Sequence, residues 1–313
     1  MKSVIVTGVN GFVGKHLVDV LHHGGFEVIG VGREDNAAVE VRSGLYQYFS
    51  CDLSDYEQVM SLPLTSAKAV INLAGLAAVG PSFNKPELYM RINTAVLDTI
   101  CQAAVEQNAK NIRIISISSG AVYSSKQQMP LTEDSLLAPE SSPYAASKIA
   151  MEQLSLKYRT QGLDCVVARP FNHIGPGQLP GFILPDMYKK VSQAIQSDKT
   201  QIRVGNITTM RDYTDVRDVA KAYVALVSAD QLRHGIYNVC SGRSLSGDEI
   251  LQKLLTGMKT NHMDTVVDES LFRPSDAPDL YGDHSKITDD TGWKPSIPIE
   301  QTIADFVNWA QTK

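Results

Sequence analysis

The sequence has few cysteines, no long apolar run and no excess of positive charge. Only four of its 313 residues are cysteines, and they are widely spaced, with neither a CxxC pair nor a Cys/His cluster. That pattern is typical of buried, reduced thiols, and we expect no metal site. No stretch reaches the roughly 18 apolar residues of a membrane span, and no signal-peptide layout opens the chain. We therefore expect a cytoplasmic protein with no membrane partner.

Acidic residues outnumber basic ones, 34 against 29, for a net charge of -5. A nucleic-acid surface needs a basic face, so we expect no nucleic-acid partner. Net charge does not exclude a local basic pocket, which a phosphate-bearing ligand would need.

Short β-rich runs alternate with longer helical patterns in the first half of the chain. The expected strands are 4–7, 28–31, 46–50, 69–73, 112–118 and 165–169, and the expected helices include 13–23, 87–107 and 144–158. Apolar strands joined by helical crossovers predict an α/β fold, a Rossmann-type doubly wound parallel sheet.

The alternation breaks at 171–186, where Pro and Gly are frequent, and further helices are expected at 187–196, 247–257 and 299–311. We expect a smaller, discontinuous C-terminal substrate domain formed by 171–211 and 241–313. The larger domain would comprise 1–170 plus about 212–240.

Three glycines follow the first strand directly and open the first helix. Glycine there permits a tight turn and close approach of the backbone to a pyrophosphate, whose charge the helix N-terminus stabilises. The larger domain is therefore predicted to bind a dinucleotide. The candidate residues are Gly8, Asn10, Gly11, Phe12, Val13 and Gly14.

The end of the second strand bears on which dinucleotide binds. NAD enzymes usually place an acidic residue there for the ribose hydroxyls, whereas here Arg33 follows a glycine and suits a 2′-phosphate. Alternatively, Arg33 merely faces solvent. NADP(H) is favoured, and NAD stays possible because Glu34 and Asp35 come next.

Further cofactor contacts are expected after the third and fourth strands. Residues at these strand ends would flank the adenine ring or let the backbone pass the cofactor, and one helical residue is counted with them. The set is Asp52, Leu53, Leu73, Ala74, Gly75 and Asn93.

A candidate catalytic group lies at the start of the helix at 144–158. Tyr144 and Lys148 are four residues apart, so they share a helix face. A nearby ammonium favours the phenolate and lowers the pKa of a tyrosine, which is otherwise about 10. Ser119 follows the fifth strand, whose carboxyl end faces the ligand crevice of such a sheet. We predict that Ser119, Tyr144 and Lys148 are catalytic and that the last two also contact the cofactor.

In these motifs the chain resembles the extended short-chain dehydrogenase/reductase family of sugar-nucleotide enzymes. The resemblance spans nearly the whole length, through TGVNGFVG, NLAG, SSGAVY, SPYAASK, RPFNHIGPGQ, RDYTDVRDV and RPSD. It implies a catalytic role for Ser119, four residues before the tyrosine of a VYG-like motif. Ser124 replaces the final glycine of that motif.

Within this family the chain is most similar to GDP-4-keto-6-deoxy-D-mannose reductases. The resemblance implies that Asn172, Arg211 and Arg273 contact the substrate diphosphate and Asp276 its ribose, with Ser119 also touching substrate. Two guanidiniums can clamp a diphosphate. The alternative for each arginine is a structural ion pair, such as Arg211 with Asp215 or Asp218.

The reaction class follows in part from what is missing. Dehydratases of the family carry acidic residues after the catalytic hydroxyl, where this chain has Gly120 and Ala121. We therefore expect NADP(H)-dependent reduction of the C4 ketone of a nucleotide-activated 4-keto-6-deoxy sugar, with GDP-4-keto-6-deoxy-D-mannose favoured.

Two alternatives remain: an NAD-dependent sugar-nucleotide 4-epimerase resembling UDP-glucose 4-epimerase, and a non-catalytic dinucleotide sensor. The resemblance also implies a homodimer formed through the helices at 87–107 and 144–158.

Overall fold

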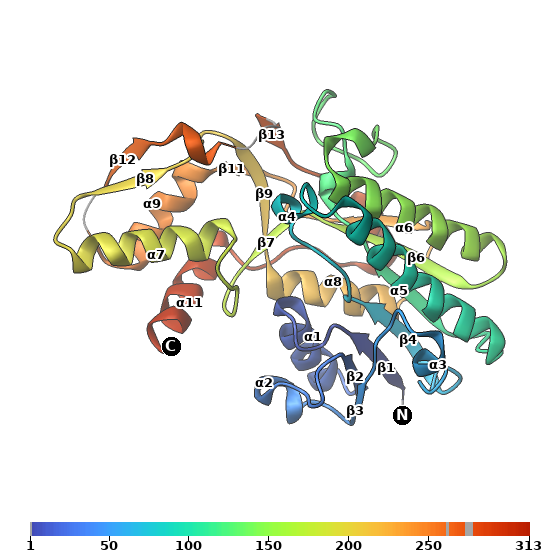
Figure 1. The fold of residues 1–313 in the computed structure, drawn as a ribbon. Coiled ribbons are helices and arrows are strands. Elements are labelled where there is room, and N and C mark those ends of the chain that lie inside the picture. Colours follow the sequence, from blue (N-terminus) through green and yellow to red (C-terminus); the bar gives the residue numbers. More distant parts are fainter. Residues whose placement is uncertain (1, 261–262, 273–277) are drawn as a thin grey trace.

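The centre of the computed structural model is a seven-stranded parallel sheet (Figure 1). The structure describes residues 2–260, 263–272 and 278–313. In spatial order the strands are β10 (Ile236–Val239), β6 (Asp164–Pro170), β5 (Arg113–Ile117), β4 (Ala67–Asn72), β1 (Ser3–Thr7), β2 (Glu27–Gly32) and β3 (Gln47–Ser50). Every pairing is parallel, and the order reverses direction at β1, which confirms the predicted doubly wound fold.

Helices cover both faces of this sheet. On one face α1 (Phe12–His23) packs against α8 (Val216–Ser228), and on the other α5 (Pro86–Glu106) packs against α6 (Pro143–Thr160). Alternate strand residues supply the two cores: Val4 and Val6 lie in the α1–α8 core, and Ile5 lies in the α5–α6 core. This alternation is what a sheet buried on both faces requires.

Short elements complete the larger lobe. They are α2 (Val39–Arg42), α3 (Tyr56–Val59), α4 (Val79–Ser82), η1 (Gly120–Val122), η2 (Pro139–Ser141) and α10 (Ser285–Thr291). All four cysteines are buried free thiols. No described helix is both long and apolar enough to cross a bilayer.

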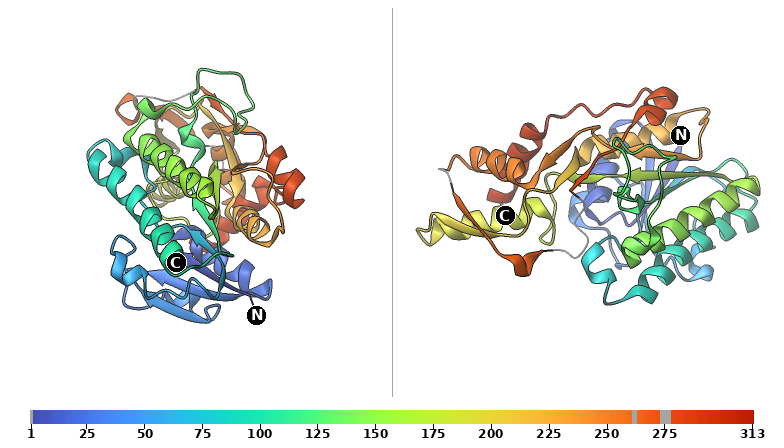
Figure 2. Two further views of the ribbon diagram at one scale, coloured as in Figure 1. Left: turned by 90° about the vertical axis from the view of Figure 1, so that its right-hand side faces the viewer. Right: turned by 90° about the horizontal axis from the view of Figure 1, so that it is seen from above.

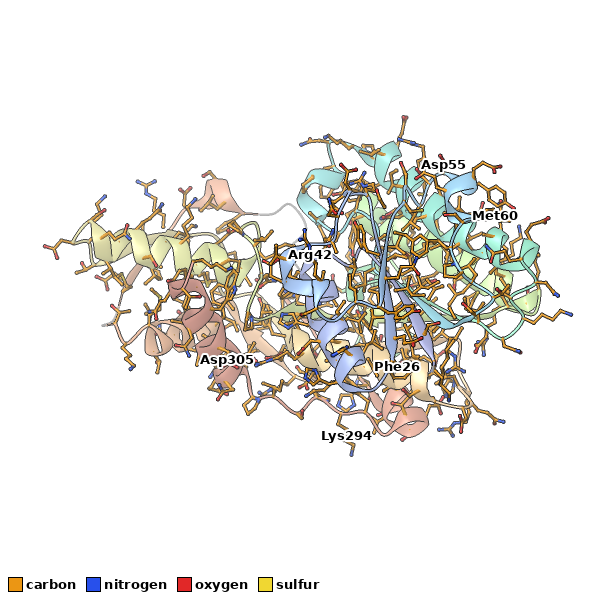
Figure 3. All side chains as sticks on the ribbon, turned by 90° about the horizontal axis from the view of Figure 1, so that it is seen from below. Phe26, Arg42, Asp55, Met60, Lys294 and Asp305 are labelled. Atoms are coloured by element: carbon orange, nitrogen blue, oxygen red, sulfur yellow. The ribbon has the colours of Figure 1, made fainter. Side chains whose placement is uncertain are left out.

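A smaller lobe lies beside the carboxyl ends of the central strands (Figures 1 and 2). It contains a small sheet of β7 (Asn172–Ile174), β9 (Met210–Asp215), β11 (Ser244–Ser246) and β13 (Asp279–Leu280), and a strand pair of β8 (Gln201–Val204) and β12 (Asp264–Val267). Its helices are α7 (Ile183–Gln196), α9 (Gly247–Gly257), α11 (Ile299–Gln311) and η3 (Glu269–Leu271). In Figure 3, Asp305 lies in this lobe, and Phe26, Asp55 and Met60 lie in the larger one. The smaller lobe has a core of its own, formed mainly by α7, α9 and α11. The domain boundaries expected from the sequence stay a prediction.

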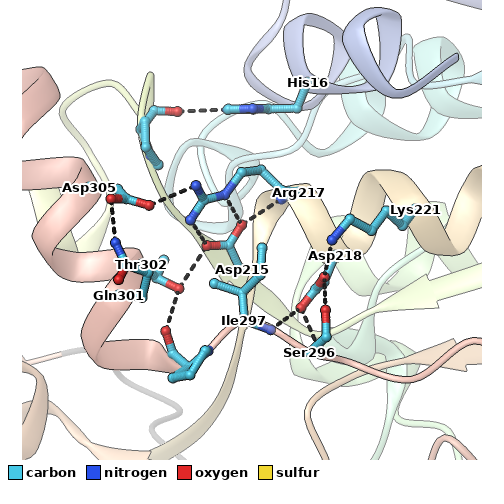
Figure 4. Close-up of polar contacts among 12 residues, drawn as sticks. His16, Asp215, Arg217, Asp218, Lys221, Ser296, Ile297, Gln301, Thr302 and Asp305 are labelled. Carbon is cyan, nitrogen blue, oxygen red and sulfur yellow. Dashed lines mark hydrogen bonds and ion pairs between the residues drawn. The ribbon is translucent and has the colours of Figure 1, made fainter. Parts of the chain in front are cut away.

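A polar cluster joins the two lobes where β9 runs into α8 (Figure 4). Asp215 caps α8 and pairs with Arg217 at 2.6 Å, and Arg217 also pairs with Asp305 of α11 at 2.7 Å. Thr302 of α11 donates a hydrogen bond to Asp215. Asp218 accepts backbone hydrogen bonds from the segment that precedes α11. These contacts hold the C-terminal helix against α8.

Candidate functional site

The glycine turn after β1 brings the backbone close to the end of β4. Gly8 has a φ of +62°, and a Cβ there would lie 3.0 Å from the amide nitrogen of Ala74. A Cβ on Gly14 would lie only 2.3 Å from the Val9 carbonyl oxygen. The N-terminus of α1, capped at Gly11, carries no capping side chain and no acidic residue in its first turn. Its free N–H groups suit a pyrophosphate, which is the fit expected of a dinucleotide.

Phe12 and Val13 lie in the first turn of α1, and both are half-buried. The Phe12 ring is nearly parallel to that of His173, with centroids 6.0 Å apart. The Pro176 carbonyl oxygen lies 2.8 Å from His16 Nε2. The RPFNHIGPGQ segment is therefore packed against the proposed pyrophosphate end of α1.

A carboxylate lies at the end of β2 after all. Asn10 donates a hydrogen bond to Glu34 at 2.8 Å, which folds Glu34 back so that a Cβ on Gly32 would lie 2.8 Å from its carboxylate. Hydrogen bonds from its own backbone amide and from Asn10 lower the pKa of Glu34, so it is ionised at neutral pH. Arg33 is exposed beside it. This end of the sheet thus offers both a guanidinium and a carboxylate to a ribose.

Of the two residues predicted to flank the adenine, one has an exposed side chain and the other a buried one. Asp52 is exposed and its carboxylate accepts from Ser54, whereas the Leu53 side chain packs into the α5–α6 core. Leu73 and Ala74 are half-buried beside the glycine turn.

Gly75, Asn93 and Lys148 converge at the end of β4. Gly75 has a φ of +151°, and a Cβ there would lie 2.8 Å from Asn93 Oδ1 and 3.8 Å from Lys148 Nζ. Asn93 is buried, accepts from the Leu76 amide at 2.8 Å and donates to Ser147 at 2.9 Å. Its amide therefore fastens the loop after β4 to α6.

Tyr144 lies at the start of α6, where local sequence fixes the helix. Ser142 caps the helix by accepting from the Ala145 amide at 3.1 Å, and Pro143 occupies the first turn. Burial raises the pKa of Tyr144 to about 12, and the nearby Ser119 hydroxyl opposes that rise. The phenol is therefore protonated and lies near the second predicted catalytic hydroxyl.

Lys148 completes the group one turn along α6. Its Nζ lies 5.9 Å from the centroid of the Tyr144 ring and donates to the Ile117 carbonyl oxygen at 2.8 Å. Burial lowers the pKa of Lys148 to about 8, and the charge of Glu152 opposes that fall. The structure thus brings Ser119, Tyr144 and Lys148 together, with an ammonium that titrates near neutral pH.

Two of the predicted substrate residues lie on the small sheet. Asn172 is exposed on β7 and pairs with Tyr213 of β9, two positions along the strand from Arg211. Residues two apart on a strand share a face, so Asn172 and Arg211 do as well. Arg211 donates to the Met210 carbonyl oxygen at 2.7 Å. Arg273 and Asp276 lie outside the described residues.

The two acidic residues suggested as ion-pair partners for Arg211 have other contacts. Asp215 binds Arg217 and Thr302, and Asp218 binds Lys221 at 3.0 Å and the backbone before α11.

Phe171 explains why position 120 is a glycine. A Cβ on Gly120 would lie 2.9 Å from the Phe171 ring, and a Cβ on Gly282 would lie 2.6 Å from the other edge of that ring. An acidic side chain at 120 would therefore collide with Phe171. Sequence reasoning noted the missing acid but not the residue that excludes it.

Two other neighbours of the site were not predicted. Tyr89 of α5 packs edge-on against Tyr144, with ring centroids 6.4 Å apart. Glu152 lies on the same α6 face as Tyr144 and Lys148, and its position four residues after Lys148 could have indicated it. Nothing in the sequence points to Tyr89, because its contact depends on how α5 packs against α6.

Comparison with known proteins places these residues in a family context. A family model described as GDP-mannose 4,6 dehydratase matches residues 5–306. GDP-6-deoxy-D-mannose reductase from Pseudomonas aeruginosa is 33% identical over 310 residues, covering 96% of this chain and 95% of that protein. GDP-6-deoxy-D-talose 4-dehydrogenase from Aggregatibacter actinomycetemcomitans is 31% identical, covering 91% and 90%.

Solved structures are similar over the full length. The structure of RMD from Pseudomonas aeruginosa complexed with NADPH has a TM-score of 0.85 at 31% identity and covers 100% of both chains. UDP-glucose 4-epimerase from Bifidobacterium longum, in complex with NAD+ and UDP, has a TM-score of 0.86 at 25% identity, covering 100% of this chain and 99% of the other.

Proposed function

Because this chain belongs to the GDP-mannose 4,6-dehydratase family of extended short-chain dehydrogenase/reductases, we propose that it reduces the C4 ketone of GDP-4-keto-6-deoxy-D-mannose with NADPH. One observation carries the choice of reaction. The Ser119–Tyr144 hydroxyl pair and Lys148 are together, while the neighbouring position 120 has no room for an acid beside Phe171. The site therefore has the groups for carbonyl reduction and lacks an acid or base next to the serine for dehydration.

The family resemblance seen in the sequence is confirmed, and with it the prediction of an NAD(P)-dependent oxidoreductase. Modification of a sugar nucleotide is supported by relatives of more than one specificity. The individual substrate is our proposal.

The proposed mechanism uses two hydroxyls and one ammonium. Ser119 and Tyr144 hydrogen-bond the C4 carbonyl oxygen, so both stabilise the negative charge that develops on it. The nicotinamide supplies the hydride when bound. Tyr144 donates its proton to the oxygen, and the Lys148 ammonium stabilises the resulting phenolate. Residues at the glycine turn and Gly75 let the backbone approach the dinucleotide closely.

NADPH is proposed over NADH on the basis of Arg33. Its exposed guanidinium can pair with a 2′-phosphate, and a similar solved reductase carries NADPH. The substrate diphosphate is assigned to Asn172, Arg211 and Arg273, and its ribose to Asp276, as the resemblance implies.

The test is a coupled pair of measurements on the purified protein. With GDP-4-keto-6-deoxy-D-mannose, NADPH absorbance should fall with substrate consumed in equal amount, and NMR of the product should show a new C4 hydroxyl. UDP- and dTDP-linked 4-keto sugars serve as controls for the base. Absence of turnover with every 4-keto sugar nucleotide would exclude the proposal.

A second candidate is an NAD-dependent 4-epimerase, and Glu34 favours it. Its carboxylate at the end of β2 suits the ribose hydroxyls of NAD. An epimerase would interconvert UDP-glucose and UDP-galactose with no net cofactor consumption. Interconversion without added NADPH would decide for this alternative.

Homodimerisation belongs to the same proposal. The α5–α6 pair is packed side by side, and Met90 and Val105 are exposed on α5. A second copy would cover them in a four-helix arrangement, which sedimentation can test. A cytoplasmic location stays a prediction.

A further inference from the structure

Three consecutive residues at the end of β5 are bound by one face of α6. The α6 residues concerned recur every fourth position, which places them on one side of the helix. Two of these contacts involve the predicted catalytic groups, and the middle one does not. In chain order, Ile117 accepts a hydrogen bond from Lys148, Ser118 donates one to Glu152, and Ser119 lies near Tyr144.

Glu152 is held in a single arrangement by buried partners. It accepts from Ser118 at 2.5 Å, and Arg169 of β6 binds both of its oxygens, at 2.9 and 2.7 Å. Glu152 and Arg169 are each 2% exposed. Arg169 also donates to the Tyr123 hydroxyl at 2.8 Å. A bidentate pair this deeply buried fixes both side chains in position and is little screened by solvent.

The charge of Glu152 acts on Lys148. Tyr144 and Glu152, both on α6, are the titratable groups that act on Lys148; beyond them, Tyr89 of α5 packs on the Tyr144 ring and Arg169 of β6 binds Glu152. Burial lowers the pKa of Lys148, and the Glu152 charge is the influence that raises it. The Lys148 ammonium therefore feels a negative charge from Glu152, one turn further along its own helix.

We propose that Glu152 is a positioning residue for this reaction: it fixes the catalytic end of β5 through Ser118 and supplies the negative charge that stabilises the Lys148 ammonium. The role in catalysis rests on the proposed function, whereas the effect on Lys148 does not. Arg169 holds the Glu152 carboxylate in place through both of its oxygens. Without Glu152, Lys148 loses its proton at lower pH and Tyr144 loses the cation that stabilises its phenolate.

The direct test is the titration of Lys148 in the whole protein. Protein carrying lysine labelled with ¹³C at Cε is titrated by NMR, and the Lys148 resonance is assigned by its loss in Lys148→Met. In Glu152→Gln the midpoint should fall by about one pH unit or more. An unchanged midpoint would overturn the proposal.

A matched variant distinguishes the effect of the Glu152 charge on Lys148 from the effect of losing a hydrogen bond in the buried network around Arg169. Tyr123→Phe removes the hydroxyl that Arg169 binds but leaves Glu152 and its charge in place. Its Lys148 midpoint should equal that of the wild type. An equal fall in both variants would mean that the buried network acts as a whole, and the assignment to Glu152 would be wrong.

Glu152→Gln leaves Arg169 buried without its partner and can lower stability. The double variant Glu152→Gln/Arg169→Met removes both charges, a replacement that buried ion pairs often tolerate. Its Lys148 midpoint should also lie below that of the wild type. Recovery of the wild-type midpoint in this folded variant would contradict the proposal.

Kinetics then connect the charge to catalysis. The alkaline limb of the kcat–pH profile for ketone reduction should move down in Glu152→Gln by the same interval as the NMR midpoint. If the midpoint moves and the limb does not, Lys148 is not the group that limits reduction. If the wild-type protein reduces no 4-keto sugar nucleotide, the proposed function fails while the titration still decides what Glu152 does.

Discussion

At the scale of single residues, the Tyr144 hydroxyl has the most specific task. It is buried near Ser119 and protonated at neutral pH, because burial raises its pKa to about 12. Tyr144→Phe should lower kcat for ketone reduction by about 10²- to 10⁴-fold, the usual contribution of a positioned acid. Stability should fall by no more than about 1 kcal/mol, the contribution of one hydrogen bond. NADPH oxidation and urea unfolding measure the two effects, and near-full turnover would remove Tyr144 from the mechanism.

The pH dependence of the reaction follows from Lys148. Burial lowers the pKa of Lys148 to about 8, so its ammonium is present below that pH and is lost as the pH rises through it. Tyr144 stays protonated over the same range. Reduction should therefore slow above about pH 8, while the reverse oxidation of the product alcohol should not slow there. Initial rates in both directions across this range test the expectation, and a reduction rate that rises with pH would contradict it.

Cofactor choice depends on two adjacent residues of opposite charge. Arg33→Ala should raise the KM for NADPH about tenfold, the lower end expected for an exposed charged hydrogen bond, and leave that for NADH unchanged. Glu34→Gln removes the negative charge beside the 2′-position and should favour NADPH. The ratio of kcat/KM for NADPH to that for NADH should move in opposite directions in the two variants. If both variants changed this ratio in the same direction, neither charge would determine which ribose is bound.

At the scale of elements, the glycine turn is the least tolerant. In Gly14→Ala the new Cβ meets the Val9 backbone at 2.3 Å, and a backbone contact cannot be relieved by a rotamer change. We expect a loss of at least about 2 kcal/mol in the free energy of unfolding, as for other overpacked sites, together with weaker dinucleotide binding. Gly80→Ala is the matched control, because a Cβ there has open space. Urea unfolding and NADPH titration distinguish the two variants, which should differ in both.

Whether a helix or strand can be predicted from sequence depends on its length and its burial. The six predicted strands all occur in the central sheet; five of them are mostly buried, and strands buried on both faces leave an uninterrupted apolar sequence. The edge strand β3 has no buried residue, and its aromatic residues alone indicated it. The edge strand β10 was not predicted: its four residues include Tyr237 and Asn238, and the pattern is too short to stand out. The short strands of the smaller lobe lack such runs for the same reason. Their pairing depends on contacts between distant segments.

At the scale of the whole molecule, sequence could predict only those site residues that belong to one local motif. The glycine turn and the Tyr144–Lys148 spacing are local, and the structure brings Ser119 to them. Glu152 with Arg169 and Gly120 with Phe171 join segments far apart in sequence, so only the folded chain reveals those pairs. Side-chain rotation limits prediction as well. Glu34 follows the end of β2 in sequence, and its bond to Asn10 returns the carboxylate to that end.

The cluster between the lobes should determine whether they unfold together. Asp215 is fully buried and depends on Arg217, which is 30% exposed and also reaches Asp305 on α11. Arg217→Met leaves Asp215 buried without its guanidinium and should cost about 3 kcal/mol. Asp305→Asn, the matched control, removes a more exposed partner and should cost no more than about 1 kcal/mol. Urea unfolding gives both values.

Loss of this cluster should also uncouple the lobes. Trp309 packs on the core of the smaller lobe, whereas Trp293 packs in the α1–α8 core, so a Trp293→Phe background makes fluorescence report the smaller lobe alone. In that background, unfolding followed by fluorescence and by circular dichroism should coincide, as in a two-state transition. With Arg217→Met added, the fluorescence transition should come at lower urea, because α11 no longer has its anchor on α8. Coincident transitions in the double variant would show that the remaining contacts between the lobes suffice to couple them.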